Sequence, residues 1–185
     1  ESKPIVEFSL ANKNNVFNPL HNNSEIIGTN PFAFLYQPSL EVMGKKSGEF
    51  LSRYAFKKNC MVFYGTSRRD SVLAASFIES AKENGLRIVS SHRLTREGSK
   101  MILSTLATPT EYDEFRYPKQ FTLKKDSLGS IFVASDDALI YAKVISSIET
   151  RGDNIIVLGS ENWLDQNTVD LEKYQNLPVV LFSPN

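Results

Sequence analysis

The stretch CMVFYGTSRRD, residues 60–70, joins an apolar run to a polar turn and the start of a helical pattern. Its first five residues are apolar or aromatic without interruption, as in a parallel strand that is covered on both faces. Ser67 is followed three residues later by Asp70, which is typical of a capping box at the start of a helix. The stretch therefore predicts one strand–turn–helix unit of a parallel α/β sheet.

Similar apolar runs recur along the chain, and helical patterns lie between most of them. Further strands are predicted at Pro4–Leu10, Phe32–Tyr36, Leu86–Ser90, Ser130–Ala134, Asn154–Leu158 and Pro178–Phe182. Amphipathic helices are predicted at Leu40–Tyr54, Asp70–Asn84 and Asp137–Thr150, with shorter ones at Gly98–Leu106 and Asn167–Tyr174. Strands that alternate with helices predict an α/β fold, a doubly wound and mostly parallel sheet with helices on both faces.

Two segments show no clear period. The Asn-rich residues 12–30 are either a functional loop or a connection that packs against a partner lobe, and we favour the second interpretation. Thr108–Lys125 is rich in Tyr, Phe, Lys and Glu, and is broken by Pro109 and Pro118. Because the chain begins without Met and stops soon after Phe182, we expect a fragment of a longer protein.

The composition excludes several classes of protein. Of the 185 residues, 41% are apolar and 23% are charged, which argues against disorder, collagen and coiled coil. The 21 Lys and Arg balance the 21 Asp and Glu, so a general nucleic-acid binder is not expected, although a local basic patch is compatible with this balance. The single cysteine, Cys60, cannot form an intrachain disulfide, and no zinc-site spacing, signal peptide or transmembrane stretch is present.

Polar residues follow three of the predicted strands, at the carboxyl ends where open α/β sheets bind ligands. They are Tyr64–Asp70, Ser135–Asp137 and Gly159–Trp163. Each group also has a structural interpretation: Ser67 and Ser135 as helix caps, acids in the first turn beside the macrodipole, and Trp163 as a core residue. No phosphate loop, dinucleotide fingerprint or nucleophile elbow occurs, so no catalytic residue and no cofactor is predicted.

Six stretches follow one another in a fixed order: residues 30–39, Met43–Leu51, Cys60–Gly65, Phe77–Val89, Ile131–Ala138 and Ile155–Trp163. In this order they resemble the second lobe of type I periplasmic solute-binding proteins, the leucine/amino-acid-binding family of ABC transporters. The match runs from about Pro31 to Asn185. It implies that residues 1–38 are the end of a first lobe and a crossover, and that residues 39–185 are a second α/β lobe. The chain also resembles envelope proteins that carry LysM modules beside this fold.

The resemblance implies that the protein is not an enzyme and binds a small polar, amino-acid-like solute between two lobes. Such a protein is the substrate-binding component of an uptake system, with a membrane permease as partner, in the periplasm or cell envelope. The implied contacts are Tyr64, Gly65, Thr66, Ser67, Ser135, Asp136, Glu161, Asn162 and Trp163. Tyr64 would pack on the solute, Ser67 and Ser135 would donate hydrogen bonds, and Asp136 or Glu161 would accept from an ammonium group.

Two departures keep other interpretations open. The turn Thr66–Arg69 lacks the family's usual acidic and small residues, and Thr95–Lys125 lacks its compact helix. They favour somewhat a cell-envelope protein-interaction or regulatory module on the same fold, without a transport role. An enzyme of flavodoxin-like or nucleotide-binding type is the weakest interpretation, because the turn after Tyr64 lacks the second glycine of a phosphate loop.

Overall fold

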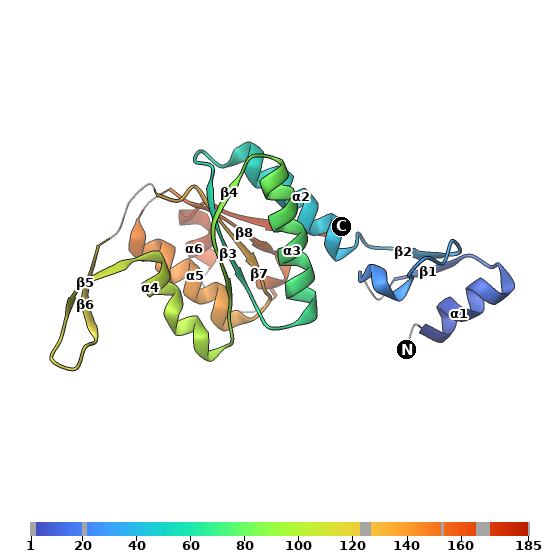
Figure 1. The fold of residues 1–185 in the computed structure, drawn as a ribbon, viewed down its shortest axis with the longest axis horizontal. Helices are drawn as coiled ribbons and strands as arrows, with labels where there is room; N and C mark the ends of the chain where they lie inside the picture. Colours follow the sequence, from blue (N-terminus) through green and yellow to red (C-terminus); the bar gives the residue numbers. More distant parts are fainter. Residues whose placement is uncertain (1–2, 20–21, 123–126, 153, 166–170, 185) are drawn as a thin grey trace.

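The core of the molecule is a five-stranded parallel sheet. A computed structural model describes residues 3–19, 22–122, 127–152, 154–165 and 171–184 (Figure 1). The strands are β3 (Asn59–Tyr64), β4 (Arg87–Arg93), β7 (Ser130–Ala134), β8 (Ile156–Ser160) and β9 (Val179–Phe182). They lie in the order β4-β3-β7-β8-β9, and all neighbours run parallel. The predicted α/β class and parallel sheet are confirmed.

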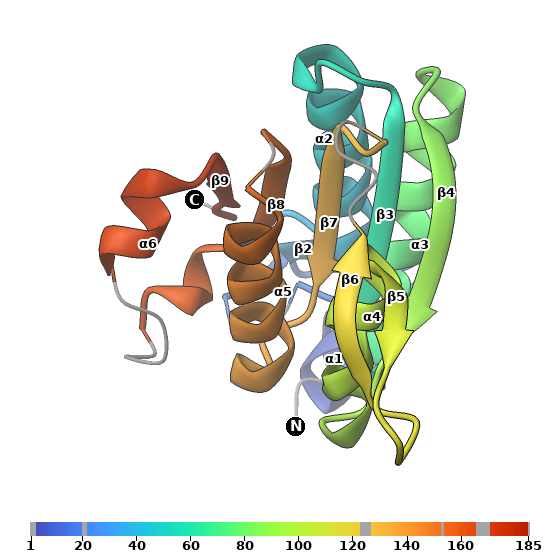
Figure 2. The same ribbon diagram turned by 90° about the vertical axis from the view of Figure 1, so that its left-hand side faces the viewer.

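Helices cover both faces of this sheet, as Figure 2 shows. On one face lie α2 (Leu40–Tyr54) and α3 (Arg68–Glu83), and on the other α4 (Ile102–Leu106), α5 (Ala138–Arg151) and α6 (Leu171–Asn176). Alternate strand residues enter the two cores: Val62 packs towards α2 and α3, whereas Phe63 packs towards α5. Both faces are buried, and this explains why the strands are continuously apolar.

Helices α2 and α3 approach so closely that their backbones touch. A Cβ atom on Gly44 would lie 2.7 Å from the carbonyl oxygen of Leu73, and one on Gly48 would lie 2.8 Å from the amide nitrogen of Ala81. Only glycine, which lacks a side chain, allows this separation. The two glycines stand four residues apart and therefore lie on the same side of α2.

The prediction of a strand at Pro4–Leu10 is wrong, because these residues belong to helix α1 (Lys3–Asn12). Val6 and Ser9 are buried three residues apart, whereas Ile5 and Phe8 are exposed. A short apolar run does not by itself separate strand from helix. Here the Ser9 hydroxyl donates to the carbonyl oxygen of Val6 over 2.8 Å, one turn back along the helix.

The Asn-rich segment contains more regular structure than its sequence indicates. Strand β1 (Val16–Asn18) pairs in parallel with β2 (Ala33–Leu35), and a short 3-10 helix, η1, spans Ser24–Ile26. This small N-terminal unit touches the start of α2, where the Ser24 hydroxyl donates to Glu41 over 2.8 Å. It also reaches the start of α3 through an ion pair between Glu25 and Arg68. Figure 1 shows the unit to one side of the five-stranded sheet.

Residues 108–122 form an antiparallel hairpin of β5 (Thr108–Tyr112) and β6 (Pro118–Thr122), where the sequence predicts irregular structure. The hairpin projects from the body of the molecule (Figures 1 and 2). Asp113 organises its tip, because one carboxylate oxygen accepts from the amides of Phe115 and Tyr117 over 2.9 and 2.8 Å. Alternation of apolar and polar residues, the usual sign of a strand, is missing here, and the side chains of residues 110–112, 119, 120 and 122 are exposed.

Two shorter predictions are confirmed in part. The predicted helix Gly98–Leu106 is a 3-10 helix, η2 (Glu97–Met101), followed by α4. The predicted helix Asn167–Tyr174 overlaps α6, but its first four residues lie outside the described part of the chain. Within the described ranges, no helix combines the length and the apolar character needed to cross a membrane.

Candidate solute site at the carboxyl edge of the sheet

The strand order places a crevice at the carboxyl ends of β3 and β7. From β3 the chain crosses through α3 to β4 on one side, whereas β7 lies on the other side of β3. The loops after β3 and β7 therefore leave in opposite directions and open a space between them, which is where ligands bind in such sheets. A pocket of about 320 Å³ lies there. It is lined by Gly65, Thr66, Ser67, Arg69, Asp70, Leu94, Arg96, Ser135, Asp136, Asp137 and Ile140.

The first wall of the pocket is the turn between β3 and α3. The predicted cap is confirmed, because the Ser67 hydroxyl accepts from the amide of Asp70 over 3.0 Å. Gly65 leaves room for the Asp70 carboxylate: a Cβ atom on Gly65 would lie 2.2 Å from Asp70 Oδ2 and 3.0 Å from Ser135 Oγ. This glycine therefore allows Asp70 to lie close to the β7 side of the pocket.

The second wall is the turn between β7 and α5, and here the predicted cap is corrected. Asp137, not Ser135, is the N-cap of α5, because its carboxylate accepts from the amide of Leu139 over 2.9 Å. The Ser135 hydroxyl instead accepts from the amide of Asp137 over 3.2 Å. Both side chains thus stabilise the turn, and they hold Asp136 between them at the pocket.

The pocket carries more negative than positive charge. Asp136 accepts hydrogen bonds from Arg69 over 3.0 Å and from Asn162 over 2.9 Å. Asp137 pairs with Arg96 over 3.2 Å. Two arginines thus face three aspartates, which leaves a formal surplus of one negative charge. The surplus belongs to Asp70, which forms no ion pair with any described residue.

The environment of Asp70 resists ionisation. Burial raises the pKa of its carboxyl above the usual value, and hydrogen bonds from Ser67 and Ser135 offset part of this rise. The negative charge of Asp136 raises the pKa further, whereas Arg69 lowers it. A cation in the pocket would relieve both the burial of the charge and the repulsion from Asp136.

A substitution at Asp136 is expected to lower the pKa of Asp70. Asp136→Asn removes the repelling charge but leaves Arg69 and the burial of Asp70 in place, so the pKa should fall only part of the way to its usual value. Carboxyl-carbon NMR over an acid titration measures this pKa directly. Asp165→Asn, on an exposed residue outside the pocket, is the matched control and should leave the titration unchanged. An unmoved Asp70 pKa in Asp136→Asn would contradict the proposed coupling.

The pocket gathers five of the nine predicted contacts: Gly65, Thr66, Ser67, Ser135 and Asp136. Tyr64, Glu161, Asn162 and Trp163 do not line it. Tyr64 is half-buried at the end of β3, and Asn162 reaches the pocket only through Asp136.

Trp163 is corrected from a solute contact to a supporting core residue. Its side chain is 0% exposed and stacks on Tyr141 at a ring-centroid distance of 4.7 Å. Its indole nitrogen donates to the carbonyl oxygen of Ser135 over 3.0 Å. A fully buried ring offers no surface to a solute, but this hydrogen bond holds the turn that carries Asp136.

The structure adds four charged residues to the predicted set, namely Arg69, Asp70, Arg96 and Asp137. Arg96 follows β4, whose carboxyl end lies at the same edge of the sheet as the end of β3. The position of Arg96 just after a predicted strand was the feature of the sequence that could have placed it near the pocket. Which of the four side chains turn towards the pocket depends on the paths of the loops.

Neither Cys60 nor His92 lines the pocket. Cys60 is buried in β3, and burial raises the pKa of its thiol to about 12, which keeps it protonated and unreactive. His92 stacks on Phe63 within the sheet, and burial lowers its pKa. Among the described residues, no group of three His, Cys, Asp or Glu side chains is placed to hold a metal ion.

Comparisons with known proteins identify the fold. No protein-family model and no curated protein matches the chain. An ABC transporter substrate-binding protein from Desulfitobacterium hafniense matches with a TM-score of 0.61 and 14% identity over 90% of this chain. One from the same organism in complex with Leu gives 0.57 and 13% over 88%. A solute-binding protein of an ABC transporter from Rhodopseudomonas palustris BisB5, in complex with 3,4-dihydroxy benzoic acid, gives 0.54 and 13% over 88%.

These matches show the fold of the chain and how much of each solved structure it covers. The chain spans 45%, 44% and 41% of the three solved structures, respectively, and therefore less than half of each. Nothing in these matches supports a LysM-associated variant. The chain thus shares its fold with part of the substrate-binding proteins of ABC transporters, in agreement with the resemblance in its sequence.

Proposed function

We propose that this chain is a non-enzymatic solute-binding lobe, whose pocket at the carboxyl edge of the sheet receives the ammonium group of a small polar, amino-acid-like solute. The observation that carries the proposal is Asp70, a carboxylate in the pocket with no ion-pair partner among the described residues. A carboxylate in such a place is best satisfied by a hydrogen-bonded cation from outside the chain.

Asp70 takes the role that the sequence had given to Asp136 or Glu161. Asp136 is already bound by Arg69 and Asn162, and Glu161 does not line the pocket. The hydroxyls of Ser67 and Ser135 lie beside Asp70 and would hold its carboxylate in place. The polar walls and the volume of about 320 Å³ suit a small solute.

The rest of the proposal concerns the longer protein. Residues 1–38, with α1, β1 and β2, would be the end of a first lobe and a crossover, and residues 39–185 the second lobe. Pro38 and Ser183 line one groove, so the two ends of the second lobe reach the same part of its surface, as the connections of a hinge would. The lobe would work outside the cytoplasm and deliver its solute to a membrane permease. The substrate-binding proteins of similar fold support this role.

An NMR titration of the 185-residue chain with pooled amino acids tests the proposal. The amides of Gly65–Asp70 and Ser135–Asp137 should shift, and Asp70→Asn should weaken binding by about tenfold to a hundredfold, the usual loss for a hydrogen bond to a charged group. Asp165→Asn is the matched control. Leucine and 4-methylpentanoate, which differ in the ammonium group, form the matched pair of probes. Equal binding of both, or an unaffected Asp70→Asn variant, would contradict the proposal, as would the absence of shifts at millimolar solute.

A second candidate function, a protein-interaction module on the same fold, is favoured by the hairpin. Tyr112, Phe115 and Tyr117 are 58%, 74% and 70% exposed at its tip. The hydrogen bonds of Asp113 hold this tip in one conformation, which lowers the entropy cost of binding. Exposed aromatic residues on an ordered loop are typical of protein contacts. This candidate predicts that the strand-end amides stay unshifted by every solute in the titration.

A further inference from the structure

The hairpin of β5 and β6 stands apart from the rest of the molecule. It follows α4 and projects from the body at the end opposite the N-terminal unit (Figure 1). A hairpin of two strands that lies outside a core is only marginally stable in water. At its tip, the rings of Tyr112, Phe115 and Tyr117 are all more than half exposed. A partner that covers these rings would therefore stabilise the hairpin.

A partner is not expected to bind by adding a strand to the hairpin. Pro109 in β5 and Pro118 in β6 have no amide proton, so each strand lacks one donor for a further ladder. The register of the pair also shifts twice, between Pro109 and Glu111 and between Glu111 and Tyr112. Prolines and such irregularities protect exposed strand edges from pairing. Contact through side chains is therefore the expected mode of binding.

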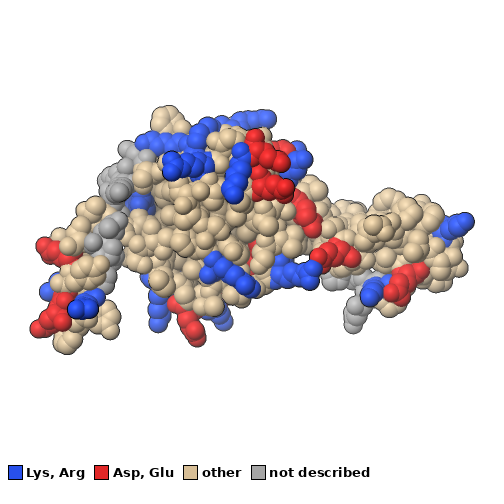
Figure 3. Space-filling view, in the orientation of Figure 1, with Lys and Arg blue, Asp and Glu red and all other residues tan. Residues whose placement is uncertain are grey.

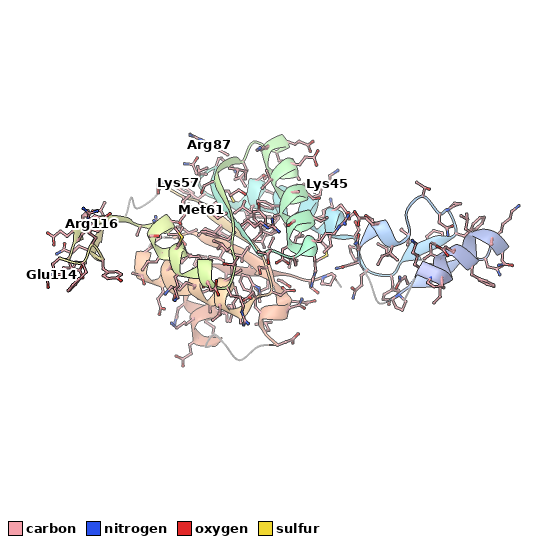
Figure 4. All side chains as sticks on the ribbon, turned by 60° about the horizontal axis from the view of Figure 1, so that its bottom comes forward. Lys45, Lys57, Met61, Arg87, Glu114 and Arg116 are labelled. Carbon is pink, nitrogen blue, oxygen red and sulfur yellow. The ribbon has the colours of Figure 1, made fainter. Side chains whose placement is uncertain are left out.

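The hairpin carries charges of both signs in balance. Glu111 and Glu114 are exposed, and so are Arg116 and Lys119. None of these four side chains forms an ion pair with a residue that the structure describes. The fifth charged residue, Asp113, is already bound by amides of the tip. Figure 3 shows acidic and basic side chains close together on the hairpin, and Figure 4 shows Glu114 and Arg116 at the same end of the molecule.

We propose that the hairpin is a self-association surface, through which two copies of this chain form a dimer about a two-fold axis. Such a dimer uses the same surface twice, so a residue i that meets residue j of the partner copy is also met as j by i. A surface of a single sign would repel its own copy. Two acidic and two basic side chains, in contrast, are able to pair across the axis. The exposed aromatic rings supply the apolar part of the contact.

The dimer is expected to be weak. Stable interfaces involve about 20–30 residues on each side, which is more than the hairpin contains, and smaller interfaces belong to transient association. A strongly acidic or strongly basic partner fits less well than a second copy, because either one would be repelled by half of the unpaired charges. No hairpin residue lines the solute pocket, so the dimer does not depend on a bound solute.

Sedimentation velocity of the 185-residue chain, over about a hundredfold range of concentration, tests the proposal. The unmodified chain should pass from monomer to dimer as the concentration rises. Glu111→Lys with Glu114→Lys makes the four unpaired charges basic, and Arg116→Glu with Lys119→Glu makes them acidic. Each variant should dimerise at least about tenfold more weakly, because like charges then face each other. An equimolar mixture of the two variants should dimerise again, because their charges are complementary.

The matched control reverses two charges elsewhere. Lys45→Glu with Lys82→Glu alters exposed lysines of α2 and α3, and it should dimerise as the unmodified chain does. Phe115→Ser should weaken the dimer by about tenfold, because it removes exposed apolar area from the tip. The amide resonances of Phe115 and Tyr117, which donate to Asp113, report whether the hairpin stays folded in each variant. If charge reversal unfolds the hairpin, Phe115→Ser decides the matter.

Three results would overturn the proposal. The first is an unmodified chain that stays monomeric at every concentration, which would leave the hairpin to a different protein. The second is a dimer that both charge-reversed variants keep, which would place the contact on another surface. The third is a mixture of folded charge-reversed variants that remains monomeric, because complementary charges would then not be what joins the two copies.

Discussion

Replacing Trp163 by alanine is expected to lower the free energy of unfolding by about 3–5 kcal/mol. The side chain is fully buried, stacks on Tyr141 and donates to the carbonyl oxygen of Ser135. Its removal leaves a large cavity between α5 and β8 and an unpaired buried carbonyl group. Since domains are stable by only about 5–15 kcal/mol, such a loss threatens the fold.

Trp163→Phe separates packing from hydrogen bonding. Phenylalanine keeps an aromatic ring against Tyr141 but has no indole nitrogen, so a smaller loss of about 1–2 kcal/mol is expected. Urea unfolding followed by far-ultraviolet circular dichroism measures both variants, because Trp163 is the only tryptophan and fluorescence would disappear with it. A loss below about 1 kcal/mol in Trp163→Ala would contradict the assignment of Trp163 to the core.

Substitution of Gly44 by leucine is expected to lower the free energy of unfolding by about 3 kcal/mol or more. The first added carbon would already lie 2.7 Å from the carbonyl oxygen of Leu73 and 2.9 Å from the amide nitrogen of Phe77. Overpacking commonly costs about 1–3 kcal/mol, and here the obstacle is backbone, which cannot turn aside. The better helix propensity of leucine offsets only about 1 kcal/mol of this cost.

The matched control for Gly44→Leu is Lys45→Leu. It places the same side chain on the next residue of α2, where the position is exposed, and should change stability by less than about 0.5 kcal/mol. Urea unfolding of both variants measures the difference. A Gly44→Leu variant as stable as Lys45→Leu would show that α2 and α3 can separate without cost, contrary to the close contact in the structure.

The regular core of the fold was predictable because local pattern and tertiary structure agree there. Strands β3 and β7 are buried over nearly their whole length, and their sequences are continuously apolar. Helix α2 is buried on one side only, and its sequence is amphipathic. The prediction of a strand at Pro4–Leu10 failed for the opposite reason. Several of its apolar residues are exposed, so their pattern indicates neither a strand nor the helix α1 that forms. The hairpin at 108–122 was missed because its sequence does not alternate between apolar and polar residues, and its side chains at 110–112, 119, 120 and 122 are exposed.

The candidate site divides in the same way. The sequence by itself determined which turns follow the strands, and hence that Gly65–Ser67 and Ser135–Asp136 meet at one edge, because parallel strands all end on the same side of a sheet. Only the tertiary structure decided which charges are paired. Arg69 satisfies Asp136 across 67 residues of sequence, Trp163 turns into the core, and Asp70 is left without an ion pair to any residue that the structure describes. Burial and pairing depend on the neighbours that folding brings together, and these cannot be read from the spacing of residues along the chain.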